Sequence, residues 1–216
     1  AKVVVKSRKH AAQNPIAQFR KETTVEQVMA DPVIADPLTR SMCCPVGDSS
    51  AAAVLVSADM LDKIKRDKNR MPIKVLGCAA QSGGYSSSTG LTCDPSENVT
   101  RTSKMAYEQA GLGPEDMDIA EIHDAFAIAE IIVAEALGFV GKGEGSRLIE
   151  EEKSNYDGDI AINPSGGLLS RGHPVGATGL LQTVEIVNQL RGEATGFQVP
   201  DANVGLIETM GGAQPA

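Results

Sequence analysis

The chain has 216 residues, of which 42% are hydrophobic and 22% are charged, so it is long enough to bury one sizeable core. Its formal net charge of −8 argues against a nucleic acid or an anionic membrane surface as a general partner. It shows neither a long apolar run nor a charged stretch followed by an apolar one near the start. We therefore expect no membrane span, no secretory signal and a cytoplasmic protein.

Cysteine and aromatic usage narrow the class of protein further. The four cysteines form no C-x-x-C pair and have no histidine at ligand spacing, so we expect no metal site and no disulfide framework. The adjacent Cys43 and Cys44 could supply a nucleophile, but we favour small buried thiols because nothing in the sequence pairs them with a base. Few aromatics (3%) and 22 glycines suit helices packed closely on a sheet, which indicates an α/β fold.

The first half of the chain predicts short elements separated by turns. We expect a short helix at residues 24–30, with the rest of the first forty residues as connecting loop broken by Asn-Pro and Asp-Pro turns. The apolar run 51–57 predicts a buried strand, and 59–66 a surface helix. Residues 73–80 predict a second strand that ends at a Ser82-Gly83-Gly84 turn.

The second half alternates more regularly between strands and helices. We expect a loop at 85–99, a helix at 101–110, a strand at 116–122, a helix at 124–137 capped by Asp124, a polar stretch at 141–157, a strand at 159–162, a helix from Pro174 or Val175 to Gly192, and strands at 198–199 and 204–207. The order of strands and helices again indicates an α/β fold.

The central feature of the sequence is the glycine-rich stretch 163–179, which holds five glycines, two prolines and one histidine, His173. We expect His173 at the amino end of the following helix, where the macrodipole and free N–H groups lower the pKa of the imidazole. A neutral ring on rigid backbone suits a base or an oxyanion donor. The alternative is a histidine that only caps the loop.

A second histidine, His123, stands in the sequence His-Asp-Ala-Phe between a predicted strand and a predicted helix. Ligands collect at the carboxyl ends of strands in open α/β sheets, which favours a functional role. A structural histidine is an equal alternative on the residues alone.

Two short motifs of the sequence resemble those of a known family. The pattern Asn-x-x-Gly-Gly followed by Gly-His-Pro-x-Gly-Ala-Thr-Gly resembles the signature loop of the thiolase superfamily, and His-Asp-Ala-Phe resembles a second thiolase motif. Both are similar to the sterol-carrier-protein-2-type and archaeal acetyl-CoA acetyltransferase branch. The resemblance implies a thiolase-like carboxy-terminal domain at 41–216, a mixed five-stranded sheet with helices on both faces, and the end of a loop region over the coenzyme A site at 1–40.

The resemblance also implies residue roles. His173 would activate a nucleophilic cysteine carried on the amino-terminal half of thiolases, which we expect to lie outside this chain, and His123 would bind an oxyanion. The substrate-binding wall would comprise Asn163, Gly166, Gly167, Gly172 and Phe126. Thiolases carry a cysteine or histidine just before a closing Gly-Gly, where this chain has Glu208-Thr209-Met210. Glu208 is a weak candidate acid or base, or else a glutamate at a strand end.

The implied activity is reversible Claisen chemistry on a coenzyme A thioester as substrate, with no bound cofactor. The implied partners are an amino-terminal thiolase half or second subunit, in a homodimer or hetero-oligomer, and the chain alone is expected to be inactive. Two alternatives stay open: a thiolase-like lyase that cleaves a sterol side-chain CoA ester by a retro-aldol reaction, and a noncatalytic acyl-CoA-binding scaffold. The lumen of a peroxisome or another organelle is the alternative location.

Overall fold

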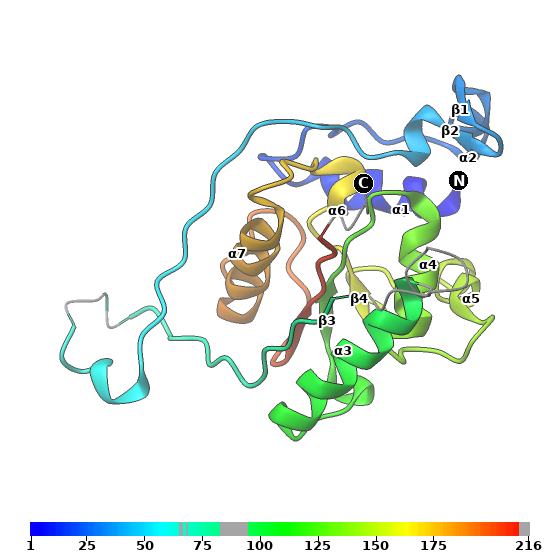
Figure 1. The fold of residues 1–216 in the computed structure, drawn as a ribbon. Helices are drawn as coiled ribbons and strands as arrows, with labels where there is room; N and C mark the ends of the chain where they lie inside the picture. The colour runs from blue at the N-terminus through cyan, green and yellow to red at the C-terminus, as the bar shows by residue number, and fades with distance from the viewer. Residues whose placement is uncertain (65–66, 68, 83–94, 212–216) are drawn as a thin grey trace.

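The computed structural model describes residues 1–64, 67, 69–82 and 95–211 (Figure 1). Its helices and strands are α1 (Lys2–Ala12), α2 (Val25–Ala30), β1 (Val33–Ala35), β2 (Leu38–Thr39), α3 (Pro95–Ala110), β3 (Ile119–Glu121), α4 (Ala127–Ala136), α5 (Gly145–Glu150), β4 (Ala161–Ile162), α6 (Gly167–Ser170), α7 (Thr178–Arg191) and β5 (Gly205–Ile207). The predicted Gly83-Gly84 turn, residues 85–94 of the predicted loop and Cys93 lie outside the described residues.

The centre of the fold is a parallel sheet in the strand order β4-β3-β5. Ile119 of β3 is in register with Ala161 of β4 and Gly205 of β5. The α/β class is confirmed, but the mixed five-stranded sheet is wrong for the described residues, in which this sheet has three strands, all parallel. A separate antiparallel pair, β1 with β2, lies near α2.

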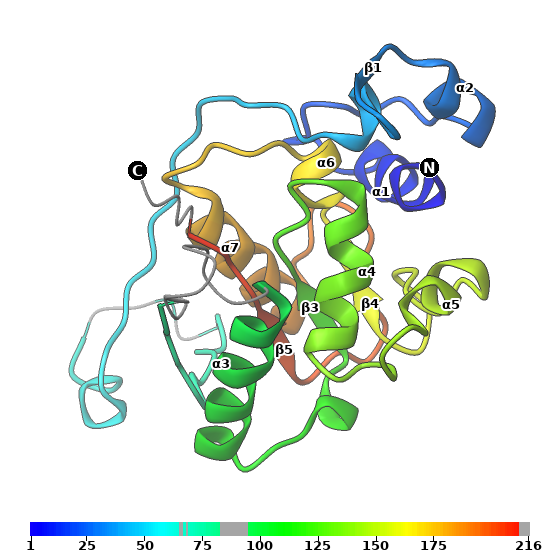
Figure 2. The ribbon, with the colours of Figure 1, turned by 45° about the vertical axis from the view of Figure 1, so that its right-hand side comes forward.

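Helices cover both faces of the sheet, as expected (Figure 2). Ile119 and Ala161 pack with Ile186 of α7 on one face. Their neighbours Ala120 and Ile162 belong to a larger cluster on the other face, which includes α3 and α4. Because successive strand residues point to opposite faces and helices cover both, apolar residues occupy both faces of β3 and β4, and Glu121 at the end of β3 is the charged exception.

The two strands predicted in the first half of the chain are not formed. Residues 45–57 run as an extended arch outside the sheet (Figure 1), with Val54 89% and Leu55 77% exposed. Residues 73–80 run beside α3, where Cys78 N–H donates to Gln109 Oε1 at 3.0 Å. An apolar run becomes a strand only where another strand offers backbone partners, and among the described residues neither 51–57 nor 73–80 lies beside one.

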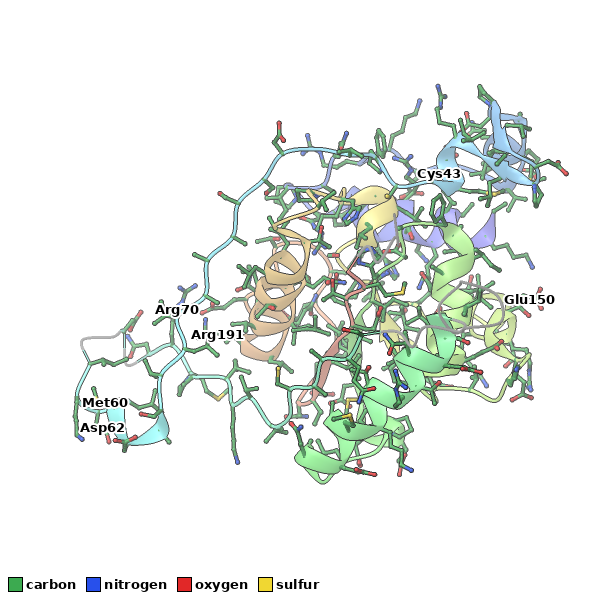
Figure 3. The ribbon with its side chains drawn as sticks, in the orientation of Figure 1. Cys43, Met60, Asp62, Arg70, Glu150 and Arg191 are labelled. Carbon is green, nitrogen blue, oxygen red and sulfur yellow. The ribbon has the colours of Figure 1, made fainter. Side chains whose placement is uncertain are left out.

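The predicted surface helix at 59–66 is also absent among its described residues, which form a short 3₁₀ helix, Ala58–Met60, followed by turns. This outer lobe rejoins the body at α7, where Arg70 pairs with Glu193 at 2.8 Å and Arg191 Nε donates to Met71 O at 2.8 Å (Figure 3). These exposed pairs contribute little to stability.

The first forty residues are not mainly connecting loop, because residues 2–12 form the helix α1. Val3, Val4 and Ala11 are buried, and α1 packs against α6. Its buried face also carries Lys6, Ser7 and His10, all polar. The apolar periodicity that predicts a helix is therefore interrupted on the very face that is buried.

The other predicted elements form with shifted ends. The helix 101–110 begins six residues earlier, as α3; α7 begins at Thr178 after a turn, four residues beyond Pro174; residues 198–199 are not a strand; and the polar stretch 141–157 contains α5. The helix 24–30 is confirmed as α2, and strands 116–122, 159–162 and 204–207 as the shorter β3, β4 and β5. Gly192 caps α7 with a φ of 70°, as predicted.

Candidate functional site

The two histidines singled out in the sequence lie together in space. His123 follows β3, whereas His173 follows α6 and precedes α7. Their ring centroids are 4.9 Å apart at an interplanar angle of 87°, an edge-to-face arrangement. The structure therefore brings the candidate catalytic residues of the two motifs into one site.

His173 is fixed on both its backbone and its ring. Its N–H donates to Pro45 O at 3.0 Å, and its Nδ1 lies 2.8 Å from Thr178 Oγ1. The Thr178 hydroxyl donates its proton to Pro174 O at 3.2 Å, so it accepts from His173 Nδ1–H. This tautomer leaves the lone pair on Nε2, which makes no hydrogen bond with the described residues.

The pKa of His173 is lowered, as expected, but the expected cause is not the leading one. Burial of the imidazole lowers this pKa first, and the neighbouring positive charge of Arg171 lowers it further. The helix amino end is not needed to explain the direction, because α7 starts five residues beyond His173. The ring is neutral at pH 7.

His123 is only 8% exposed. Burial first, and the adjacent His173 second, lower its pKa to about 4. Its Nδ1 lies 3.5 Å from Thr209 Oγ1, and its backbone N–H donates to Glu208 Oε2 at 2.9 Å. His123 is therefore a neutral ring held from the end of β5.

Glu208, the weak candidate acid or base, stands directly after β5. Its N–H donates to Glu121 O at 2.9 Å, and its carbonyl accepts from Gln182 Nε2 at 3.1 Å. Burial raises the pKa of its carboxyl group to about 7, opposed by the hydrogen bond from His123 N–H. A carboxyl group with this pKa can both give and take a proton near neutral pH.

The residues predicted to form the substrate-binding wall fix the glycine-rich loop that leads to His173. Asn163 has a φ of 52°, and its Oδ1 accepts from Ile122 N–H at 2.8 Å, which ties the loop to β3. Gly166 has a φ of 98°, and a Cβ there would lie 2.6 Å from Ala11 Cβ of α1. Gly172, with a φ of 113°, passes close to Gln18. These contacts explain why the backbone needs glycine here.

Asp124 does not cap α4, contrary to the prediction. It is buried, and its Oδ1 accepts from Leu168 N–H at 2.6 Å, so it caps the short helix α6. A Cβ on Gly167 would collide with this carboxylate. Burial raises the pKa of Asp124 well above its usual range. The His123 motif is thereby joined to the loop of His173.

Phe126, Cys43 and Cys44 lie along one edge of the site. Phe126 opens α4, is 47% exposed and forms an isolated bridge with Cys43. Cys44 N–H donates to Ala125 O at 2.9 Å. Burial and the charge of Asp124 raise the pKa of the Cys44 thiol, so it is not an activated thiolate.

Sequence reasoning missed the polar residues of α1, and of the segment just after it, that bond the backbone around Asn163. His10 Nε2 accepts from Tyr156 N–H at 3.3 Å, so its Nδ1–H donates to Asn163 O at 3.0 Å. Lys6 Nζ donates to Ile162 O at 3.0 Å, and Asn14 Nδ2 to Ser165 O at 2.9 Å. Part of the signal was present, because Lys6 and His10 are four residues apart on one helix face, whereas Asn14 follows the end of α1.

A cavity of about 350 Å³ opens beside His173. Its lining includes Ile16 and Gln18 from the segment after α1, Asp48 from the outer arch, and Arg171 and Gly172 from the histidine loop. Within the described residues no group of three His, Cys, Asp or Glu side chains could hold a metal ion. In the same part of the chain, no helix is long and apolar enough to cross a bilayer.

These features have known counterparts. Residues 77–215 match the family model described as thiolase C-terminal domain-like, and the chain belongs to this family.

Two curated relatives align over 98% of the chain. It is 42% identical to the acetyl-CoA acetyltransferase of Methanothermobacter thermautotrophicus, of which it covers 54%, and 41% identical to sterol carrier protein 2 of Bos taurus, of which it covers 39%. The solved structure of an Ltp2-ChsH2(DUF35) aldolase superposes with a TM-score of 0.79 and 27% identity, over 95% of this chain and 53% of that one. The chain thus spans about half the length of these proteins or less.

Proposed function

We propose that this chain forms the carboxy-terminal part of an acyl-CoA thiolase, which interconverts 3-ketoacyl-CoA and shorter acyl-CoA thioesters. The observation that carries the proposal is the pair of neutral histidine rings, 4.9 Å apart, in which the Nε2 of His173 keeps its lone pair. The 42% identity to an acetyl-CoA acetyltransferase supports the substrate class.

The chemistry divides between this chain and a cysteine outside it. His173 Nε2 takes the proton of the cysteine thiol, and the thiolate attacks the 3-keto carbon of the substrate. The bond between carbons 2 and 3 then breaks, and its electron pair passes into the enolate of acetyl-CoA. His123 donates a hydrogen bond to the oxygen that becomes negative. A second thiol, that of coenzyme A, releases the acyl group from the cysteine.

Glu208 is our candidate for the group that protonates the enolate carbon. Its carboxyl pKa of about 7 leaves much of it protonated at neutral pH, and its Oε2 is 2.9 Å from the backbone nitrogen of His123. The proton returned to carbon is regained from the thiol of the incoming coenzyme A. Glu208 would then take the place of the cysteine or histidine that the thiolase pattern has at this point.

The proposal extends to the partners of the chain. Residues 1–40 would help to cover the coenzyme A site, since Ile16 and Gln18 line the cavity beside His173. The nucleophilic cysteine would come from an amino-terminal half or a second subunit, in a dimer or hetero-oligomer in the cytoplasm. The chain spans 54% and 39% of the length of two relatives, which supports an additional portion that carries the cysteine.

A second candidate function is carbon–carbon lyase activity on a CoA ester, favoured by the likeness to the aldolase. A retro-aldol cleavage needs a base for a hydroxyl proton and a donor for the enolate oxygen, but no acyl-cysteine. His173 and His123 could fill these roles. The fixed Nε2 lone pair of His173 serves either reaction, so the acyl-enzyme intermediate is the feature that separates them.

The test is thiolysis of a 3-ketoacyl-CoA by the native assembly that contains this chain. We expect His173→Asn to lower kcat by about 10²–10⁴-fold and His123→Ala by about 10²–10³-fold. The control is Glu150→Gln, which changes an exposed side chain at the end of α5 (Figure 3) and should keep the rate. Intact-mass measurement after acetyl-CoA should show an acetyl group on a cysteine outside these 216 residues. Full thiolysis by His173→Asn would overturn the proposal, and turnover without an acyl-cysteine would select the lyase.

A further inference from the structure

A buried glutamate two residues before His123 bonds several segments of the site. Glu121, at the end of β3, is fully buried and stands two residues before His123. Its Oε2 accepts from Ser165 Oγ at 2.9 Å, and its Oε1 accepts from Ser165 N–H at 3.2 Å. Its backbone carbonyl accepts from Glu208 N–H at 2.9 Å. Glu121, itself the last residue of β3, thus bonds the loop after β4 and the segment after β5.

The fourth contact reaches the loop of His173. Arg171 NH1 lies 3.4 Å from Glu121 Oε2, and the two side chains are 3% and 0% exposed. Arg171 stands two residues before His173, just as Glu121 stands two residues before His123. The ion pair therefore joins the backbones of both histidine segments at equivalent positions.

The pair is not explained as a gain in stability. Removing two charges from water carries a large free-energy penalty, and apolar replacements of buried ion pairs are often neutral or stabilising. This penalty is visible in the pKa of Glu121, which is raised to about 7. Burial is the main cause, the charge of Arg171 opposes it, and the nearby Glu185 of α7 adds to it. Arg171 Nε and NH2 are also buried without a hydrogen-bond partner in the described structure. A fixed geometry is what such a pair can supply.

We propose that Glu121 and Arg171 are positioning residues, whose ion pair, together with the bonds from Glu121 to Ser165, holds the ring of His173 edge-to-face against that of His123. This role rests on the proposed function for its purpose, but the geometry it predicts can be measured without activity.

The experiment uses the fact that the chain has only three histidines, so ring signals in an NMR spectrum are few. The nuclear Overhauser effect between the rings of His123 and His173 reports their contact. His10 is an internal marker of folding, because its two ring nitrogens bond Asn163 and Tyr156. We expect Glu121→Gln and Arg171→Met to lose the effect between His123 and His173 while the His10 signal stays in place. Arg171→Lys should restore it, since it keeps a cation that can reach Glu121.

A matched control is Glu130→Gln, which removes a second buried carboxylate that pairs with a cation, Lys6 at 2.5 Å. We expect it to lower stability but keep the ring contact. If Arg171→Met does not fold, Ser165→Ala, which removes one bond to Glu121 without leaving a bare charge, should weaken the contact. Retention of the ring contact in folded Glu121→Gln or Arg171→Met would overturn the proposal. Loss of thiolysis in His173→Asn tests the proposed function separately, so the two can fail independently.

Discussion

Apolar residues are buried in the central sheet of this chain but exposed in the outer arch, residues 45–57. At the sheet, Ile119, Ile122 and Ile162 are fully buried, and every strand of the site region has a strand beside it. In the outer arch, Val54 and Leu55 belong to an equally apolar run but are exposed and unpaired. Composition alone therefore does not distinguish a strand from an extended segment. What distinguishes them is whether a neighbouring strand is available to pair with the backbone.

The largest expected effect lies in the inner part. Ile122→Ala removes buried volume directly before His123 and should lower the free energy of unfolding by about 2–5 kcal/mol in urea titration. Ile128→Ala on α4 is the control, because Ile128 is exposed and its truncation leaves no cavity. Equal losses in the two variants would contradict the described core.

The glycines of the site loop sharpen the comparison at single positions. Gly167 has a φ of 60°, and a Cβ there collides with Asp124, so Gly167→Ala should cost about 2–4 kcal/mol. Gly176 lies in the same loop but has open space around it. Gly176→Ala should stay within about 0.5 kcal/mol of the wild type in the same titration. A tolerated Gly167→Ala would show that the Asp124 cap of α6 is not as described.

The next prediction concerns Glu208 and pH. Its pKa is about 7 in the fold, above the ordinary 4.5, so the folded state holds a proton that the unfolded state releases in that interval. This group therefore makes stability fall as the pH rises from about 4.5 to about 7. Glu208→Gln has no carboxyl group to titrate, so it does not lose stability in this way as the pH rises. The free energy of unfolding of the variant, relative to that of the wild type, should therefore increase from pH 4.5 to about 7.

Chemical unfolding at a series of pH values measures this difference. Glu150→Gln is the control, because Glu150 is exposed and makes only a 3.8 Å pair with Lys2. A constant difference between Glu208→Gln and the wild type from pH 5 to 8 would show that the carboxyl group is not buried.

The smallest effect is expected in the outer arch. Leu55→Ser replaces an exposed side chain that packs against nothing described in the core, so stability should change by no more than about 0.5 kcal/mol. Differential scanning calorimetry of the two proteins measures it. A loss beyond about 1 kcal/mol would mean that the arch is packed, and would remove the contrast between the two regions.

The same contrast explains what the sequence could predict. The α/β class, the helix that ends at Gly192 and the two histidines were readable, because caps, glycines and strand-to-helix junctions are local signals. The strand predictions at 51–57 and 73–80 failed because pairing is not local. The helix α1 was missed because Lys6 and His10 occupy its buried face, where they bond the backbone around Asn163.

Within the site, the candidate residues could be predicted but the bonds between them could not. His123 and His173 were found from their motifs, whereas Glu121 and Arg171, which pair with each other, carry no motif that marks a contact 50 residues apart in sequence. Asp124 was predicted to cap its own helix and instead caps α6, because the fold offers the buried N–H groups of Leu168 and Leu169. Such long-range polar bonds depend on tertiary structure alone.

The proposed function depends on one central claim, that this chain presents two neutral histidines in one site. The most direct measurement is an NMR pH titration of the three histidine rings, with signals assigned by single His→Gln variants. We expect His10 to titrate at about 3, His123 at about 4 and His173 below 6.5. A pKa at or above 6.5 for His123 or His173 would mean a ring that is charged or freely exposed, and would contradict the account.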